Sequence, residues 1–367
     1  MAGETGPLLR REGVGGRTLG LGLAAAAAAG GIAAWLVLSG NPGNMGICGA
    51  CFLRDIAGSL GMFEAGPRIF RPELAGVLLG AYLWALTRGR FEARSGSHAA
   101  ARFVLGMLMG AGALVFLGCP FRMMQRLGGG DGNALSGLAG FLAGVGAAVL
   151  LEKRGYTVGR TSPAPAPVGR LGPAVALGLL ALFLYGGFLR GPGPGSADPP
   201  PHAPWRTALT LGLFGGAALS LTGFCGVAAA RGLVQRKWAM PLGALALMAA
   251  YGGVVAAGGK WKGGFEGQPF SHSDHAASFL AMALVGLTGA FAGGCPVRQV
   301  VMAGEGNGDA LVTAAGIAAG GALSHTFGLV STGAGATVAG RNVVIGGIVV
   351  VLIYGWSVAR YARAASA

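Results

Sequence analysis

Apolar segments of membrane-spanning length recur along the chain, separated by polar or by glycine- and proline-rich connections. They fall near residues 18–39, 72–88, 101–118, 133–151, 171–189, 205–222, 238–258, 277–293, 308–323 and 341–358. About 20 apolar residues cross a bilayer as a helix, so the pattern predicts an all-α, polytopic membrane helix bundle of about ten spans. The segments that end at residues 88 and 323 are short for a straight span.

The composition also indicates a membrane protein. Hydrophobic residues make up 53% of the 367 residues and charged residues 11%, whereas a soluble domain carries roughly a quarter charged residues. The first apolar segment is too long for the hydrophobic region of a signal peptide, so we expect it to be the first span. Most of the 73 glycines are expected to let helices approach closely.

The net charge of +14 would suggest a nucleic-acid partner in a soluble protein. In a lipid bilayer the positive-inside rule explains it, and we expect no nucleic-acid partner. Basic residues concentrate in residues 1–17, 88–102, 152–170, 231–237 and 360–363. We therefore predict a multi-pass protein of the bacterial inner membrane, with these segments in the cytoplasm and the loops 190–204 and 258–275 outside.

The chain contains an internal repeat. Gly-Cys119-Pro120-Phe-Arg122 aligns with Gly-Cys295-Pro296-Val-Arg298, and Asp131-Gly-Asn133 aligns with Asn307-Gly-Asp309, both at an offset of 176 positions. Upstream, Gly46-Ile-Cys48-Gly49 aligns with Gly223-Phe-Cys225-Gly226, at an offset of 177. One apolar segment separates the two halves, so the second half is predicted to be inverted relative to the first, as in many transporters.

This repeat divides the chain into five parts. They are a cytoplasmic N-terminus (1–17), a first membrane half (18–152), a linker with one span (153–204), a second membrane half (205–340) and a final span with a basic tail (341–367). In this topology the loops of Cys48 and Cys119 enter from outside, and those of Cys225 and Cys295 from inside.

The repeated motifs predict a site for a small anion. Proline after a cysteine interrupts a helix, and helix N-termini attract anions. Thiols are soft and polarizable, which favours a ligand with a terminal sulfur or selenium atom. The candidate site residues are Cys48, Cys119, Cys225, Cys295, Arg122 and Arg298, with Asp131 and Asp309 as possible internal partners of the two arginines.

Other patterns leave alternatives open. Cys48 and Cys51 have a C-x-x-C spacing, but Cys51 aligns with Ala228, so we favour neither a metal site nor a redox site there. A solvated loop is favoured for the cluster His272, Asp274 and His275. His325 lies near a membrane end, at an interface or in a proton relay. Arg54, Arg68 and Arg71 fall outside, where either they form an anion-attracting mouth or the topology is locally wrong.

These motifs resemble the YeeE/YedE family of membrane proteins over residues 20–355, and most closely its YedE branch, which is described as selenium-transporting. In the thiosulfate-transporting branch, cysteines in re-entrant loops are taken to pass the substrate along. The resemblance implies this role for Cys48, Cys119 and Cys295, and the repeat adds Cys225. It also implies cooperation with a separate small sulfur carrier of the TusA type.

The sequence therefore predicts a permease, not an enzyme, that imports a small sulfur- or selenium-containing anion without a cofactor or metal. The alternatives are a membrane sulfur or selenium transferase with a cysteine persulfide or selenide, and an assembly factor in which the cysteines are silent. Importing a dianion against an inside-negative potential costs about 4–5 kcal/mol per 100 mV. Either co-transported protons or intracellular chemistry must offset this cost.

Overall fold

The computed structural model describes residues 16–159, 161–193, 197 and 200–364, and these form an almost wholly helical protein. The ten longer helices are α1 (Gly16–Leu38), α3 (Pro72–Thr87), α4 (Ala99–Val115), α6 (Ala134–Lys153), α7 (Ala166–Tyr185), α8 (Trp205–Thr222), α10 (Ala239–Ala257), α11 (His275–Phe291), α13 (Gly308–Thr326) and α14 (Val338–Ala364). The shorter helices are α2 (Gly49–Ser59), α5 (Pro120–Gly128), α9 (Gly226–Gln235) and α12 (Pro296–Gly304). Strands β1 (Arg94–Ser95) and β2 (Ser162–Pro163) pair antiparallel. The all-α class is thus confirmed, while the predicted cytoplasmic segment 1–17 lies outside the described residues except at its end.

Each predicted apolar segment overlaps one of the longer helices. By length and composition, eight helical units of the described chain can cross a membrane: Gly16–Leu38, Ala99–Gly128, Ala134–Lys153, Ala166–Tyr185, Trp205–Gln235, Ala239–Ala257, His275–Gly304 and Val338–Ala364. Helices α3 and α13, whose segments are short for a span, are not among them. The protein is therefore a multi-pass membrane protein by this measure, and the count of ten spans stays a prediction.

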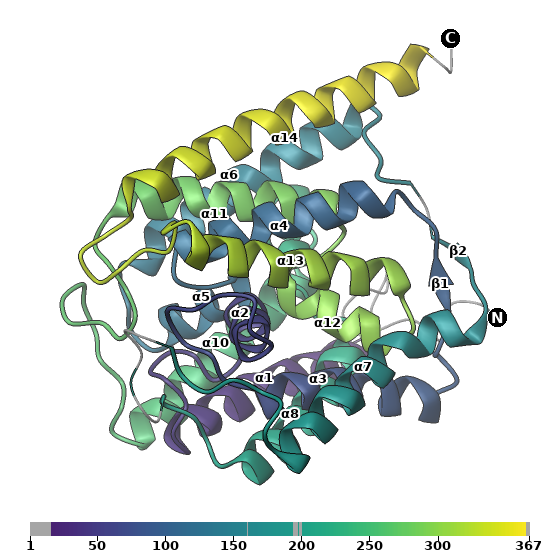
Figure 1. The fold of residues 1–367 in the computed structure, drawn as a ribbon. Helices are drawn as coiled ribbons and strands as arrows, with labels where there is room; N and C mark the ends of the chain where they lie inside the picture. The colour runs from purple at the N-terminus through teal and green to yellow at the C-terminus, as the bar shows by residue number, and fades with distance from the viewer. Residues whose placement is uncertain (1–15, 160, 194–196, 198–199, 365–367) are drawn as a thin grey trace.

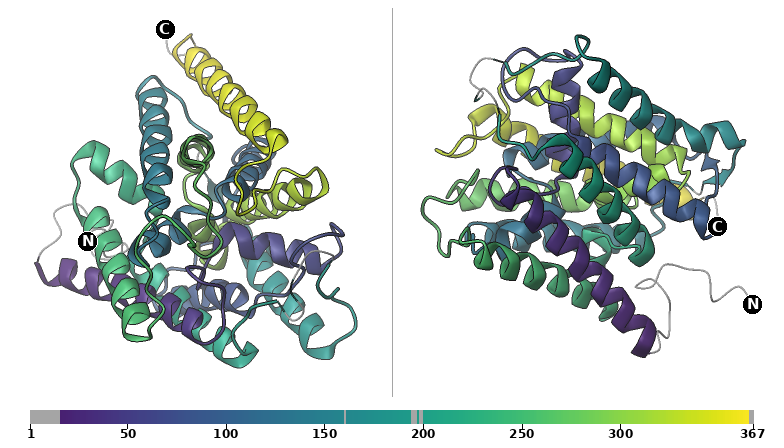
Figure 2. Two further views of the ribbon diagram at one scale, coloured as in Figure 1. Left: turned by 90° about the vertical axis from the view of Figure 1, so that its left-hand side faces the viewer. Right: turned by 90° about the horizontal axis from the view of Figure 1, so that it is seen from below.

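Helices from the two halves of the chain interlock. Helix α1 packs along α10, α3 along α8, α4 along α13 and α6 along α11, and every one of these pairs joins the first half to the second. Figures 1 and 2 show the longer helices side by side, with α2 and α12 in the middle of the bundle. The predicted boundaries of the halves thus divide the sequence, but the halves do not pack as separate bodies.

Two glycine contacts between helices are equivalent under the internal repeat. Gly140 of α6 lies against the backbone of Phe279 of α11, and a Cβ there would collide with a carbonyl oxygen. Gly316 of α13 lies in the same way against the backbone of Phe103 of α4. Both pairs relate through the 176-residue offset. Small residues allow this close approach of helices, as expected for many of the glycines.

The loops gather in two groups at opposite ends of the bundle. At the first, which we call the proline-loop end, Arg68 donates to the carbonyl of Gly191 (2.8 Å), and Ser331 donates to that of Val115 (2.6 Å). At the other, the basic end, marked by β1 and β2 in Figure 1, the Arg94 N–H donates to the carbonyl of Gly306 (3.1 Å). These are the groupings of loops that the predicted topology requires.

Candidate functional site

Each of the four repeated cysteines stands directly before a short helix. Cys48, Cys119, Cys225 and Cys295 are the N-cap residues of α2, α5, α9 and α12. Pro120 and Pro296 are the first residues of α5 and α12. Proline is favoured at this position because it lacks the N–H that the first turn leaves unpaired. The repeated motifs therefore act locally as helix-start signals.

The starts of these helices meet in the middle of the bundle. Gly49 of α2 lies against Pro296 of α12, and Gly226 of α9 lies against Pro120 of α5. Both contacts join the first half to the second. They are equivalent under the internal repeat, because Gly49 aligns with Gly226 and Pro120 aligns with Pro296. A helix N-terminus carries a partial positive charge and unpaired N–H groups. Four such ends are therefore brought toward one region.

The thiols form what we call the cysteine cluster: Cys48, Cys51, Cys119, Cys225 and Cys295. The thiol of Cys48 is in hydrogen-bonding contact with that of Cys119 and accepts from the backbone N–H of Cys51 (3.3 Å). The thiol of Cys225 accepts from the N–H of Cys295 (3.4 Å). The contact of Gly49, next to Cys48, with Pro296, next to Cys295, links the two groups. All five side chains are buried, and no disulfide joins the described cysteines.

Cys51 belongs to this cluster although the repeat gave no reason to include it. Its thiol contacts that of Cys48. The spacing of three residues places Cys51 one turn into α2, above its N-cap. Helical periodicity, applied to the start at Gly49, is the signal that could have found it. The first half thus contributes three thiols and the second half two.

Arg122 brings positive charge to the cluster. It is buried, and its guanidinium donates to the backbone carbonyls of Asn44 (3.1 Å), Leu117 and Phe270 (3.2 Å). Within the described chain no carboxylate lies within ion-pair distance of it. Its charge acts on both Cys48 and Cys51. Arg122 is thus a buried cation held by neutral groups, close to thiols.

The predicted partners of the two arginines are wrong. Arg298 forms a two-pronged ion pair with Glu305 (2.7 and 3.1 Å), the C-cap residue of α12, seven positions further along the chain. Asp309 instead accepts hydrogen bonds from the α3–α4 connection, namely from Ser95 (3.1 Å), the Gly96 N–H (3.0 Å) and Ser97. Asp309 lies in the first turn of α13 and bonds to a neighbouring loop, whereas Glu305 caps the helix that contains Arg298.

Asp131 is also engaged elsewhere than predicted. It pairs with Arg126 at 2.6 Å and accepts from the N–H of Asn133 at 3.0 Å. Arg126 lies one turn after Arg122 on α5, close to the loop that contains Asp131. Both aspartates therefore hold loops at the ends of α5 and α12, and neither is the counter-ion of a motif arginine.

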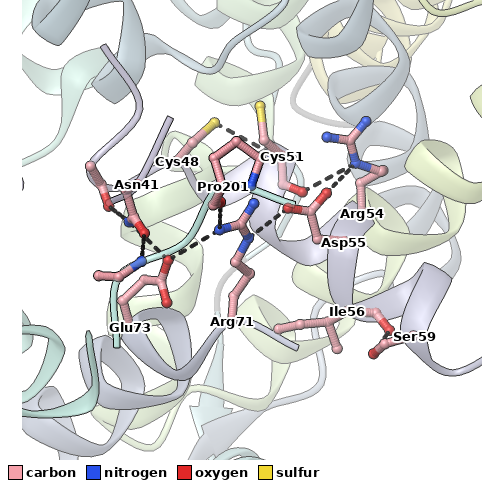
Figure 3. A network of polar contacts seen from close by, with 12 residues as sticks. Asn41, Cys48, Cys51, Arg54, Asp55, Ile56, Ser59, Arg71, Glu73 and Pro201 are labelled. Carbon is pink, nitrogen blue, oxygen red and sulfur yellow. Dashed lines mark hydrogen bonds and ion pairs between the residues drawn. The ribbon is translucent and has the colours of Figure 1, made fainter. Parts of the chain in front are cut away.

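The arginines predicted as a possible mouth are mostly bound internally. Arg54 and Arg71 are buried, and both donate to Asp55 at 2.7 Å (Figure 3). Arg68 donates to Gly191 and Pro192 at the surface. Arg54 also contacts the ring nitrogen of His325 at 2.6 Å, and this half-buried histidine lies in the last turn of α13. Sequence reasoning did not identify the carboxylates Asp55 and Glu73 of this network.

A cavity of about 280 Å³ opens at the proline-loop end. It is lined by Val37, Gly43, Asn44, Val255, Lys260, Lys262, Gly267 and Pro269. Asn44 joins this cavity to the cysteine cluster, because its carbonyl accepts from Arg122 (3.1 Å). Two lysines at the rim make the cavity attractive to anions.

The polar loop cluster serves the fold. His272 is buried and its ring contacts the carbonyl of Val115 (2.9 Å), so it is not a solvated residue as predicted. Asp274 caps α11 and pairs with Arg341 of α14 at 2.5 Å. Within the described residues, no group of three or more histidine, cysteine or acidic side chains could hold a metal ion.

Comparison with models of known protein families and with curated proteins finds no match to this chain. The argument for function therefore rests on the cysteine cluster, the helix starts around it and the charges that face it.

Proposed function

We propose that the protein is an inner-membrane permease that imports a small sulfur- or selenium-containing anion, such as thiosulfate or selenite, through the cysteine cluster. One observation carries this proposal. Thiols from both halves of the chain meet in a buried region where four helix N-termini converge beside Arg122. The resemblance of the motifs to the YeeE/YedE family supports the same function.

The chemistry of the cluster suits such an anion. Helix N-termini and an arginine without a carboxylate partner offer positive charge. Thiols add soft, weakly hydrogen-bonding contacts, which favour a terminal sulfur or selenium over the oxygen atoms of sulfate. A cationic ligand would be repelled at the same place, and a neutral ligand would gain no charge attraction there.

The contacts suggest an order of passage. An anion would enter the lysine-rimmed cavity and meet Arg122 beyond Asn44. It would pass from Cys48 and Cys119 to Cys225 and Cys295, and leave at the basic end. The cluster is buried in this conformation, so we expect the two halves to open alternately, as in transporters built from inverted repeats in about ten spans. By the positive-inside rule the basic end faces the cytoplasm, where a TusA-type sulfur carrier would receive the product.

The test is uptake of labelled thiosulfate and of selenite into liposomes that contain the purified protein. We expect saturable uptake of at least one anion by wild type, and a graded loss in Cys48→Ala, Cys119→Ala, Cys225→Ala and Cys295→Ala. Glu64→Gln changes a carboxylate that is 78% exposed and serves as the control. Unchanged uptake in all four cysteine variants would exclude the cluster as the route. The absence of uptake by folded wild type would overturn the permease and favour the transferase or the assembly-factor alternative.

A sulfur transferase is the second candidate, favoured by the contact of Cys48 with two other thiols beside Arg122. A thiolate would attack the outer sulfur of thiosulfate, the sulfur–sulfur bond would break, and sulfite would leave. This predicts one indispensable cysteine with a mass increase of one sulfur atom after incubation with thiosulfate. A permease predicts uptake without this adduct, so mass spectrometry of the intact protein separates the two.

A further inference from the structure

We propose that Glu73 is the proton-binding site that couples anion import to the pH gradient. This inference rests on the proposed permease function and names the source of its driving force. A proton carried with each dianion reduces the charge that moves inward from two to one. The sequence shows no run of intramembrane carboxylates for this purpose, but the structure places two buried carboxylates, Asp55 and Glu73, beside the cysteine cluster (Figure 3).

The two carboxylates are unequally compensated. Asp55 accepts from the Nε of Arg54 and from the Nε of Arg71, both at 2.7 Å. Glu73, in the first turn of α3, lies 3.7 Å from Nη1 of Arg71 and accepts from Nδ2 of Asn41 at 3.0 Å. Asp55 thus holds both arginines at hydrogen-bonding distance, while Glu73 has one shared arginine and a neutral amide. Both carboxylates are buried, so the less compensated one, Glu73, is the one on which a proton is better accommodated.

Among the described residues, the charges that act on Glu73 are those of Arg71 and Asp55. Helix α12 also packs on α3, and there Arg298 and Glu305 pair with each other. On α8, Gly212 lies against its backbone, and in the α7–α8 connection the carbonyl of Pro201 accepts from Arg71. His202 of that connection is exposed and turned to the Ala203 carbonyl. Beyond Arg54, Nε2 of His325 on α13 must accept, because arginine only donates, so this ring is neutral. Protonating Glu73 therefore changes the network of two arginines and two carboxylates from neutral to a single positive charge.

This change reaches the cysteine cluster by two routes. Arg54, which shares Asp55 with Arg71, donates to the backbone carbonyl of Cys51 (3.4 Å), so a more positive network favours an anion at the thiols. The amide of Asn41 that donates to Glu73 also donates to the carbonyl of Gly46 (3.0 Å), two residues before Cys48. The N–H of Gly46 in turn donates to Gln125 of α5 (2.8 Å). Proton and anion thus strengthen each other's binding, as reciprocal linkage requires.

The experiment measures thiosulfate accumulation in proteoliposomes at several imposed inward pH gradients. If one proton enters with each anion, the inside-to-outside concentration ratio of thiosulfate rises in proportion to the outside-to-inside ratio of protons. Each pH unit of gradient therefore raises the accumulation by wild type about tenfold. Glu73→Gln keeps the acceptor for Asn41 and is expected to exchange thiosulfate across the membrane without any response to the gradient. The exposed-site control Glu64→Gln and the conservative Glu73→Asp are expected to retain the response.

Infrared spectroscopy gives a readout that does not depend on transport. Lowering the pH should produce carbonyl bands of protonated carboxylic acids, and one component of these should be present in wild type and in Glu64→Gln but missing in Glu73→Gln. Wild-type uptake that ignores the gradient, or a Glu73→Gln variant that still follows it, would overturn the coupling role and leave the permease intact. The absence of any wild-type uptake, with the band present, would overturn the permease and coupling together. Should the glutamine variant not fold, the gradient response of wild type and Glu73→Asp decides.

Discussion

Gly49, which follows Cys48, packs directly against Pro296, which follows Cys295. A Cβ at position 49 would lie 2.6 Å from the backbone nitrogen of Val297 and 2.8 Å from Cβ of Pro296. The contact joins the start of α2 to the start of α12, and so sets how closely cysteine loops of the two halves approach. Its counterpart, Gly226 against Pro120, is looser, with a nearest separation of 3.0 Å to a side-chain carbon.

We predict that Gly49→Ala impairs uptake more than Gly226→Ala. The methyl group at position 49 meets rigid backbone and a proline ring, so α2 must shift, at a cost of about 1–3 kcal/mol for overpacking. At position 226 a few tenths of an ångström of movement suffices. Initial uptake rates and thermal unfolding of the two purified variants check this. Equal behaviour of the variants would show that the Gly49 contact does not control the cysteine loops.

We predict that Cys48→Ser preserves stability but loses transport. The Cys48 thiol accepts from the N–H of Cys51, and a serine hydroxyl caps a helix at least as well. Serine, however, lacks the soft sulfur atom. Cys48→Ala, which removes the cap too, should be less stable than Cys48→Ser by about 1 kcal/mol. Full uptake by Cys48→Ser would contradict a role for the sulfur atom.

Asp131→Asn is expected to destabilise the protein by about 3–5 kcal/mol, because it leaves the buried charge of Arg126 without its partner. The double variant Arg126→Met with Asp131→Leu removes both charges and should recover much of the loss. The matched control is Glu64→Gln, which breaks exposed pairs worth about 0–1 kcal/mol. Denaturant unfolding in detergent measures the free energy of unfolding of the three variants. If Asp131→Asn lowers it no more than Glu64→Gln does, the ion pair does not stabilise the α5 loop.

His272 is predicted to make the protein sensitive to acid. Burial lowers the pKa of His272 below its ordinary value of 6.5, despite its contact with the Val115 carbonyl. The unfolded chain therefore binds a proton more readily than the folded one, and stability falls as the pH drops through about 6.5. Between pH 7.5 and 5.5 the unfolding temperature should decrease less in His272→Asn than in wild type or in His275→Asn, an exposed control. Parallel decreases in all three would assign the acid sensitivity to other groups.

Much of the architecture was predictable from short-range features of the chain. The lengths of the apolar runs marked all ten longer helices, because bilayer thickness limits a span and backbone hydrogen bonds must be satisfied within it. Proline or glycine after each repeated cysteine marked where the short helices begin. The alternation of basic loops anticipated which loops meet at each end.

The partners of charged and thiol groups could not be predicted in this way. Arg298 binds Glu305 and not Asp309, Arg126 and not Arg122 holds Asp131, and Cys51 joins a cluster that the repeat does not suggest. Asp55 binds Arg71, and Glu73 accepts a hydrogen bond from Asn41; in each of these pairs the two residues come from different segments of the chain. Run length, proline and loop charge act through a few neighbouring residues. Ion pairing and clustering depend instead on how α2, α3, α5 and α12 are oriented against one another, and only packing across the two halves decides that.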